Sequence, residues 1–182
     1  MLEEVILNQS GEHQEHAMGE SGNSAQVASK KPRANSGESV ADIIENQLDD
    51  VIKEWLVRIE KEPSLASIPL NFEERTGHLP ELLHDVIRRL RMDDEFKAPI
   101  SQAAAHHGDL RSQQGYTIAM AVEESRLLQV SIFSTLHSSQ HHLEFSTVLP
   151  AVVTIADEVD AQLKQQMLRF TAADKAKAAK SK

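Results

Sequence analysis

The sequence predicts an all-α protein, a bundle of five main helices that ends in a long C-terminal helix. From Ser39 onward, apolar residues recur at intervals of three and four, the spacing that places them on one face of a helix. No segment alternates apolar and polar residues cleanly enough to predict a strand. With 40% hydrophobic residues in a chain of 182, the protein can bury a core of one domain.

The composition argues against several functional classes. The formal net charge is -9, whereas a nucleic-acid-binding protein normally has a basic face. The chain contains no cysteine, so it forms no disulfide, thiolate nucleophile or sulfur-ligated metal site. Residues 1–7, MLEEVIL, are acidic where a signal peptide is basic, and the apolar run at 145–156 is too short to span a bilayer. We expect a cytoplasmic protein that binds neither nucleic acid nor membrane.

The chain divides into three parts. Residues 1–38 are rich in Ser, Gly, Glu, Asn and Gln and have little apolar periodicity, which predicts a disordered tail. Residues 39–172 carry the helical pattern and form the predicted domain. Residues 173–182 are basic and low in complexity, which predicts a second flexible tail.

Local signals bound the first two main helices. Ser39 followed by Asp42 resembles a capping box, and Pro63 disfavours helix at Glu62, so the first helix should span this interval. Its predicted buried face comprises Val40, Ile44, Leu48, Val51, Trp55, Leu56 and Ile59. A short helix can start near Asn71, and the second main helix near Leu79. The buried face of that second helix comprises Leu79, Leu82, Leu83, Val86, Ile87 and Leu90.

Three further helices complete the prediction. The third runs from about Pro99 to Gln114 and stops at Gly115, a plausible C′ glycine. Thr117 caps the fourth, which is apolar around most of its circumference and should be central. A turn at 137–142 leads to the fifth helix, from Phe145 to about Ala173. The expected apolar stripe of this helix comprises Phe145, Leu149, Val152, Ala156, Val159, Leu163, Met167 and Phe170.

Polar residues interrupt the apolar stripe of the third helix. His107, Arg111 and Gln114 continue the face that Ile100 and Ala104 begin. Buried polar groups need hydrogen-bond partners, because an unpaired one costs a few kcal/mol. On the fourth helix, Glu124 lies at the edge of the apolar face, so we predict a charge-assisted Arg111–Glu124 pair between the two helices.

Two neighbours join the predicted polar network. Gly108 lies in mid-helix, where glycine costs about 1 kcal/mol relative to alanine, so a backbone or a ligand should approach closely there. Tyr116, the only tyrosine, follows the helix end, and we expect it to be half-buried with its hydroxyl in water.

Three interpretations of this network remain open. It can be a structural device that fixes helix register, a ligand or signalling site, or a catalytic site. The sequence contains no H-E-x-x-H, P-loop or G-x-S-x-G pattern, so we expect no enzyme.

Nine histidines raise the alternative of metal or haem binding. His137 and His141 have the i, i+4 spacing of two ligands on one helix face, but no third ligand is evident nearby. We expect His84 to be solvated and His78 to do no more than cap a helix or contact water. The prediction is no metal and no cofactor.

Four segments together resemble a known family. They are Trp55, LPELLHDVIRRL at 79–90, HHGDLRSQQGY at 106–116 and EESRLL at 123–128. Through these segments, the region 40–165 resembles the N-terminal domain of RsbT co-antagonist proteins of the RsbRD type. It is also similar to helical sensory segments that precede bacterial histidine kinases. The resemblance implies a globin-like, haem-free, dimeric domain of bacterial stress signalling. Its family-type residues here are His107, Gly108, Arg111, Gln114, Gly115, Tyr116 and Glu124, with no implied catalytic role.

The resemblance also implies how such a domain acts. No phosphoacceptor or kinase sequence follows the helical segment in these 182 residues, so we expect action through a partner such as a kinase or stressosome-type component. The apolar spacing that continues from Val159 to Phe170 predicts a homodimer through the C-terminal helix. The alternative function is a helical sensor of a small ligand, haem or metal.

Overall fold

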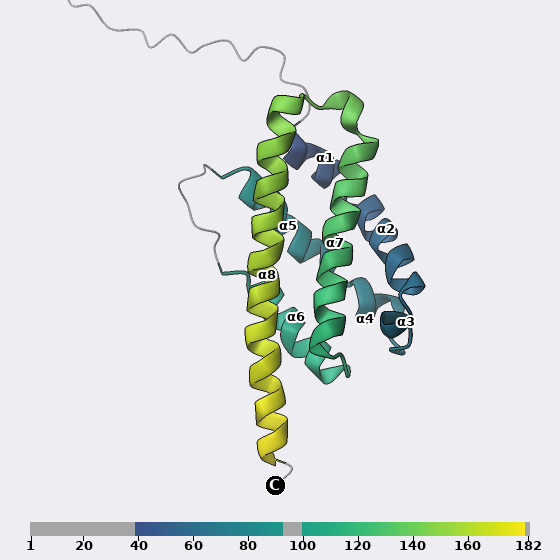
Figure 1. Ribbon diagram of the computed structural model, residues 1–182, viewed down its shortest axis with the longest axis vertical. Helices are drawn as coiled ribbons and strands as arrows, with labels where there is room; N and C mark the ends of the chain where they lie inside the picture. The colour runs from purple at the N-terminus through teal and green to yellow at the C-terminus, as the bar shows by residue number, and fades with distance from the viewer. Residues whose placement is uncertain (1–38, 93–99, 181–182) are drawn as a thin grey trace, which may run out of the picture. The chain divides into compact units, whose positions relative to one another are not determined.

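The computed structural model describes residues 39–92 and 100–180, which lie in one compact unit, Asn35–Lys182. Every element in these ranges is helical and none is a strand, which confirms the all-α class (Figure 1). The tail predicted at 1–38 and the helix start predicted at Pro99 fall outside the described residues. Within the described ranges, no helix combines the length and apolar character needed to cross a bilayer.

The first predicted helix is divided into two, α1 (Val40–Asn46) and α2 (Leu48–Lys61). The capping box is confirmed, because Ser39 Oγ accepts from the Asp42 amide and Asp42 accepts from the Ser39 amide. The break falls at Gln47, whose side-chain amide donates to Ser139 Oγ at 2.8 Å. It allows α1 to contact α5 while α2 packs along α7.

Two short helices, α3 (Pro63–Ala66) and α4 (Phe72–Thr76), form the connector to α5 (Leu79–Leu90). The predicted helix near Asn71 is confirmed, and its cap accepts from the Glu74 amide at 2.9 Å. The buried Arg75 guanidinium fixes the connector by donating to the carbonyls of Leu65 and Ile68 at 3.3 and 2.8 Å. The chain therefore enters α5 from a rigid turn.

The middle of the chain forms α6 (Gln102–Gln113) and α7 (Ile118–Ser138). Ser101 caps α6 through the Ala104 amide, so Ile100 precedes the helix and is exposed instead of belonging to its buried face. Gly115 has φ +86°, as a C′ glycine should. Thr117 caps α7, as predicted, and α7 contacts α1, α2, α3 and α8.

The last helix, α8 (Phe145–Lys180), follows a short 3-10 turn, η1 (Gln140–His142). It extends beyond Ala173, so the helix end predicted there is wrong: residues 174–180, assigned to the basic tail, continue the helix. Alanine and lysine favour helix strongly, and Ser112 of α6 holds this end through Asp174 and Lys177. In Figure 1, α8 runs alongside α7 and past α6.

The inner face of α8 differs from the predicted one. Ala151, Ile155, Val159 and Phe170 are buried, whereas Phe145 and Leu149 are exposed. The stretch from Val159 to Phe170 packs on α6 of the same chain, since α6 and α8 form the most extensive helix contact. Val159 and Phe170, which begin and end the stretch expected to pair two copies, are therefore buried within the chain, whereas Leu163 and Met167 are partly exposed.

Candidate functional site

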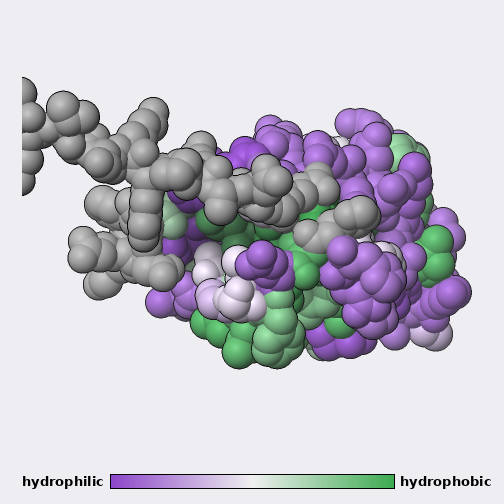
Figure 2. Space-filling model, turned by 90° about the horizontal axis from the view of Figure 1, so that it is seen from above, coloured by the Kyte–Doolittle hydropathy of each residue, from purple (hydrophilic) through white to green (hydrophobic). Residues whose placement is uncertain are grey.

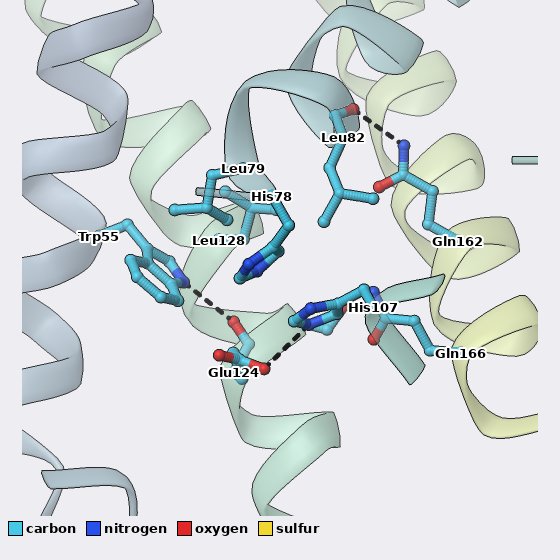
Figure 3. Close-up of a pocket in the computed structure, with 10 residues that line it drawn as sticks. Trp55, His78, Leu79, Leu82, His107, Glu124, Leu128, Gln162 and Gln166 are labelled. Atoms are coloured by element: carbon cyan, nitrogen blue, oxygen red, sulfur yellow. Dashed lines mark hydrogen bonds and ion pairs between the residues drawn. The ribbon is translucent and has the colours of Figure 1, made fainter. Parts of the chain in front are cut away.

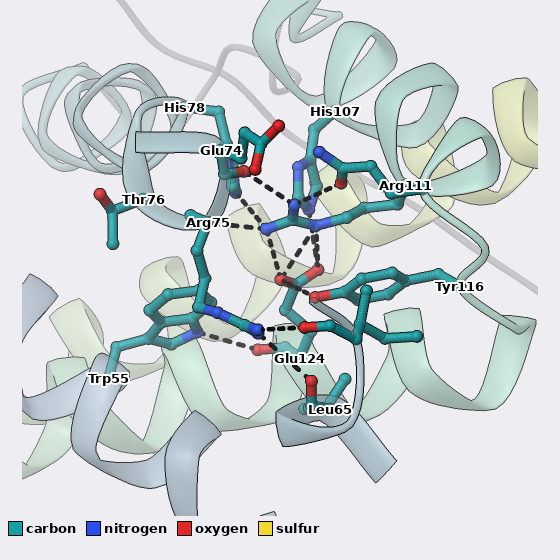
Figure 4. A network of polar contacts seen from close by, with 12 residues as sticks. Trp55, Leu65, Glu74, Arg75, Thr76, His78, His107, Arg111, Tyr116 and Glu124 are labelled. Carbon is teal, nitrogen blue, oxygen red and sulfur yellow. Dashed lines mark hydrogen bonds and ion pairs between the residues drawn. The ribbon is translucent and has the colours of Figure 1, made fainter. Parts of the chain in front are cut away.

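The predicted polar network is assembled where α4, α5, α6 and α7 meet. The middle and last turns of α6 contribute His107 and Arg111, and α7 contributes Glu124. Helix α4 brings the backbone carbonyls of Glu74 and Arg75 to the same point. Arg111 is 1% exposed and Glu124 3%, so both charges lie in the interior (Figure 4).

Arg111 uses all its donor directions. Its Nε lies 3.0 Å from both carboxylate oxygens of Glu124, and Nη2 donates to Oε1 at 2.7 Å. The remaining hydrogens of Nη1 and Nη2 reach the carbonyls of Glu74 and Arg75 at 3.1 and 3.0 Å and Gln114 Oε1 at 2.6 Å. The predicted Arg111–Glu124 pair is confirmed, and its fixed fork geometry explains why arginine suits this position.

Glu124 is equally well satisfied. His107 Nε2 lies 3.1 Å from Oε2, and the Tyr116 hydroxyl donates to Oε1 at 3.3 Å. The indole of Trp55 donates to the Glu124 backbone carbonyl at 3.3 Å. The expectation of a wet Tyr116 hydroxyl is wrong, because the side chain is 4% exposed and its ring packs 4.8 Å from the Arg111 guanidinium.

His78 is the member that the sequence did not predict. Its ring stacks on that of His107 with centroids 3.8 Å apart and an interplanar angle of 20°. Its Nε2 lies 3.4 Å from Arg111 Nη2, so the neutral ring can share one of the hydrogens that Nη2 donates at shorter distance to Glu124 and Arg75. The expectation that His78 only caps a helix or contacts water is wrong, since it is 9% exposed and forms no side-chain cap bond. The sequence did offer one indication that His78 is buried, because it directly precedes Leu79, which was predicted to be buried.

The ionisation states follow from burial and neighbours. Burial lowers the pKa of His78 well below its ordinary value, and the positive charge of Arg111 lowers it further. Burial also lowers the pKa of His107, against the opposing effect of Glu124. For Glu124, burial alone would raise the pKa, but His107 and Arg111 outweigh it and lower the pKa. At neutral pH the site holds one carboxylate, one guanidinium and two neutral imidazoles.

Gly108 brings α6 against α8, as its mid-helix position predicted. A Cβ atom at this residue would lie 2.3 Å from the backbone oxygen of Gln166 and 2.8 Å from its Cα. Both atoms belong to the backbone, so neither can move aside as a side chain would. The close approach is to another helix of the same chain, which explains the glycine without a ligand.

A small cavity lies beside the two histidines (Figure 3). About 10 Å³ is available in it to the centre of a water molecule, roughly the room that one water needs. His107 Nδ1 is buried and has no hydrogen-bond partner among the described residues. A water bound here would satisfy this nitrogen. The lining residues are Trp55, His78, Leu79, Leu82, His107, Glu124, Ser125, Leu128, Gln162 and Gln166.

A second polar row on α8 was not predicted. Glu158, Gln162 and Gln166 occur at i, i+4 and i+8 and are buried. Gln162 Nε2 donates to the Leu82 carbonyl at 3.0 Å and to Glu158 Oε1 at 3.1 Å. Burial raises the pKa of Glu158. The i, i+4 spacing places these three residues on one face of the predicted helix, which could have indicated a buried polar row. The neighbouring apolar residues led to the choice of a different buried face.

Among the residues that the structure describes, one group has the side chains to hold a metal ion. His78, His107 and Glu124 each offer a ligand atom, and these atoms lie within 4.8 Å of one another. The other proposed pair does not share a helix face, because His137 lies in α7 and His141 in η1. His84, His106 and His137 are exposed, as expected for His84.

The chain matches no protein-family model, no curated protein and no solved structure. The resemblance to the RsbRD-type domain therefore stays a prediction carried by the residues that suggested it. Of these residues, His107 and Arg111 bind Glu124 of α7, Tyr116 donates to the same carboxylate, Gln114 accepts from Arg111, and Gly108 contacts α8.

Proposed function

We propose that this chain is a helical sensory or regulatory domain of bacterial stress signalling, of the RsbRD type. It acts in the cytoplasm through a protein partner or a second copy and not by catalysis. The observation that carries the proposal is the saturation of the buried network. Every donor of Arg111 and both oxygens of Glu124 are used within the chain.

Saturation favours a regulatory role over a catalytic one. A general acid or base must reach the proton that it transfers, within about 3 Å or through one water. Glu124 is 3% exposed and engaged by Arg111, His107 and Tyr116, and the adjoining cavity has room for about one water. A substrate would first have to displace interactions that join four helices.

The same network provides a route for a signal. Arg111 links α6 to α7 and to α4, and Gly108 allows α6 to approach α8 closely. Packed helices with discrete contacts shift as units, so a partner that displaces one helix changes the others. This coupling suits a domain whose output is an altered surface.

The test uses the kinase and the stressosome-type scaffold protein of the same genome. Titration calorimetry should show micromolar binding of the purified chain to one of them, and the chain should change phosphate incorporation by the kinase at least about twofold. Arg126→Ala, an exposed change on α7, should leave the buried network intact and serves as the folding control. Absence of binding and of any kinase effect at 100-fold molar excess would reject the proposal.

A metal sensor is the second candidate, favoured by the His78–His107–Glu124 cluster. The rings of His78 and His107 are stacked, so their nitrogen lone pairs point in nearly parallel directions and do not converge on one ion. At least one ring would have to rotate before both could bind the same ion. The ion would replace the proton between His107 Nε2 and Glu124 Oε2 and sit close to the Arg111 charge. Haem does not fit a cavity of this size.

Trp55, the only tryptophan, reports on this alternative because its indole contacts Glu124. Addition of Zn²⁺, Co²⁺ or Ni²⁺ should leave its emission unchanged if the network is structural. A saturable change that His78→Phe abolishes and the exposed His84→Phe retains would establish the metal site.

A further inference from the structure

The first three turns of α8 present an exposed apolar stripe, which we define as Phe145, Leu149 and Val153. These side chains are 83%, 59% and 63% exposed, and their i, i+4, i+8 spacing places them on one face of the helix. Seen from the end of the unit where α7, η1 and α8 meet, apolar surface lies beside pale, uncharged residues (Figure 2). Apolar side chains grouped in this way indicate an interaction surface.

The stripe lies in the segment best suited to contact a second copy. Residues 145–156 contain no Asp, Glu, Lys or Arg, in a chain whose net charge is -9. Two copies of an acidic protein repel each other over most of their surface. A charge-free segment allows approach without placing like charges in contact.

Two threonine hydroxyls beside the stripe are already satisfied by nearby backbone carbonyls. The Thr147 hydroxyl donates to the Glu144 carbonyl at 2.8 Å, and the Thr154 hydroxyl donates to the Pro150 carbonyl at 3.1 Å. Pro150 has no amide hydrogen to donate. Removing water from this face therefore leaves few donors without partners, which lowers the cost of burying it.

We propose that the stripe is a two-fold interface between two copies of this chain, with the two α8 helices antiparallel. Leu149 lies on the axis and meets Leu149 of the partner subunit. Phe145, the largest side chain, then faces Val153 of the partner subunit, the smallest, so that the volumes match across the axis. Antiparallel helix dipoles also favour this arrangement.

This inference rests on the homodimer in the proposed function and changes its location. Val159 and Phe170, the ends of the stretch first expected to pair two copies, are buried within the chain, whereas Phe145, Leu149 and Val153 are open to a partner. Three turns of helix are only about 16 Å long, which is too short a contact to bury the roughly 800 Å² per partner of a standard interface. We therefore expect a reversible dimer with a dissociation constant in the micromolar range.

Sedimentation equilibrium from 1 to 500 μM tests association. The unaltered chain should shift from monomer to dimer with concentration, and Leu149→Asp should weaken dimerisation about 100-fold, because two buried leucines are lost and two like charges face each other. Leu168→Asp is the matched control, since Leu168 has the same type, helix and exposed fraction, 59%. A monomer at all concentrations, or equal effects of both variants, would overturn the interface.

Disulfide cross-linking tests the register of the two α8 helices. Because the chain has no native cysteine, every cross-link must come from the introduced residues. Leu149→Cys should cross-link to itself under mild oxidation at 50 μM, whereas Leu168→Cys should not. A mixture of Phe145→Cys and Val153→Cys should yield mainly the heterodimer. Cross-linking of Leu168→Cys but not Leu149→Cys would overturn the proposed axis. If the chain stays monomeric yet binds and regulates the kinase, this interface fails while the proposed function stands.

Discussion

Two regions of the molecule reverse the usual distribution of polar and apolar residues. At the junction of α6 and α7, a carboxylate, a guanidinium and two imidazoles are shielded from water. On the first turns of α8, a phenylalanine, a leucine and a valine face solvent. This difference shows that the burial of a side chain depends on whether another helix supplies a group that contacts it. The polar groups are buried because each has a counterpart from another helix, and the apolar groups are exposed because no segment among the described residues covers them.

The buried ion pair should give the largest effect. Glu124→Gln removes the charge opposite Arg111 and should lower the free energy of unfolding by about 3–5 kcal/mol, because the guanidinium is left buried without its counterion. Urea unfolding followed by Trp55 fluorescence measures this loss. Glu123→Gln, the adjacent and partly exposed carboxylate paired with Arg126, should cost less than about 1 kcal/mol. Similar losses for the two variants would contradict the view that burial makes the difference.

The close approach of α6 and α8 should give the next effect. Gly108→Ala places a methyl group against the Gln166 backbone, and overpacking of about 3 kcal/mol less about 1 kcal/mol of improved helix propensity leaves a net loss of about 2 kcal/mol. At Gly115, where nothing lies within 4 Å of a Cβ but φ is +86°, alanine should cost about 1 kcal/mol from backbone strain alone. Thermal unfolding by circular dichroism should rank the two, and a more stable Gly108→Ala protein would refute the contact.

Acid should weaken the polar junction first. His78 and His107 have lower pKa values in the folded chain than the ordinary value of 6.5, so below about pH 6.5 the unfolded chain binds more protons. Stability is therefore complete above pH 6.5 and falls as pH decreases, by up to about 1.4 kcal/mol per pH unit for each histidine. Glu124, whose pKa is also lowered, adds to the loss below about pH 4.5.

Urea titrations between pH 7.5 and pH 5 measure this slope. His78→Phe keeps a stacked ring but removes one titrating group, and it should reduce the slope by about half. The exposed His106→Gln, next to His107 in sequence, serves as the control and should leave most of the slope in place. An unchanged slope in His78→Phe would show that this histidine is protonated equally in both states.

A single hydrogen bond at the edge of the network should give a smaller effect. Tyr116→Phe removes the hydroxyl that donates to Glu124 Oε1 at 3.3 Å, while the carboxylate keeps its other partners. We expect a loss of about 1 kcal/mol in urea unfolding. A loss as large as that of Glu124→Gln would mean that the hydroxyl, and not Arg111, holds the carboxylate.

The apolar stripe should give the smallest effect on folding. At a concentration that favours monomer, Leu149→Asn should change the free energy of unfolding by less than about 0.5 kcal/mol, because the side chain is already 59% exposed. Urea unfolding at 1 μM measures this change. A loss above about 1.5 kcal/mol would show that the stripe packs within its own chain, which would remove the contrast between the two regions.

The sequence by itself determined the helical class, most helix ends and the Arg111–Glu124 pair. Caps such as Ser39 and Thr117 and the glycine at 115 act through hydrogen bonds and dihedral angles a few residues away, so local sequence specifies them. The pairing of Arg111 with Glu124 was predictable because two adjacent helices joined by a short turn must face each other.

Three features were decided only by the tertiary structure. They are the side of α8 that is buried, the stacking of His78 on His107, and the burial of the Tyr116 side chain. These outcomes depend on contacts between elements far apart in the chain, such as α5 against α8 and α4 against α6. On α8, Gln162 and Gln166 are buried in place of Phe145 and Leu149, because α5 and α6 lie beside the former and cover them. Periodicity marks a face of a helix, but the position of the neighbouring helices determines whether water reaches it.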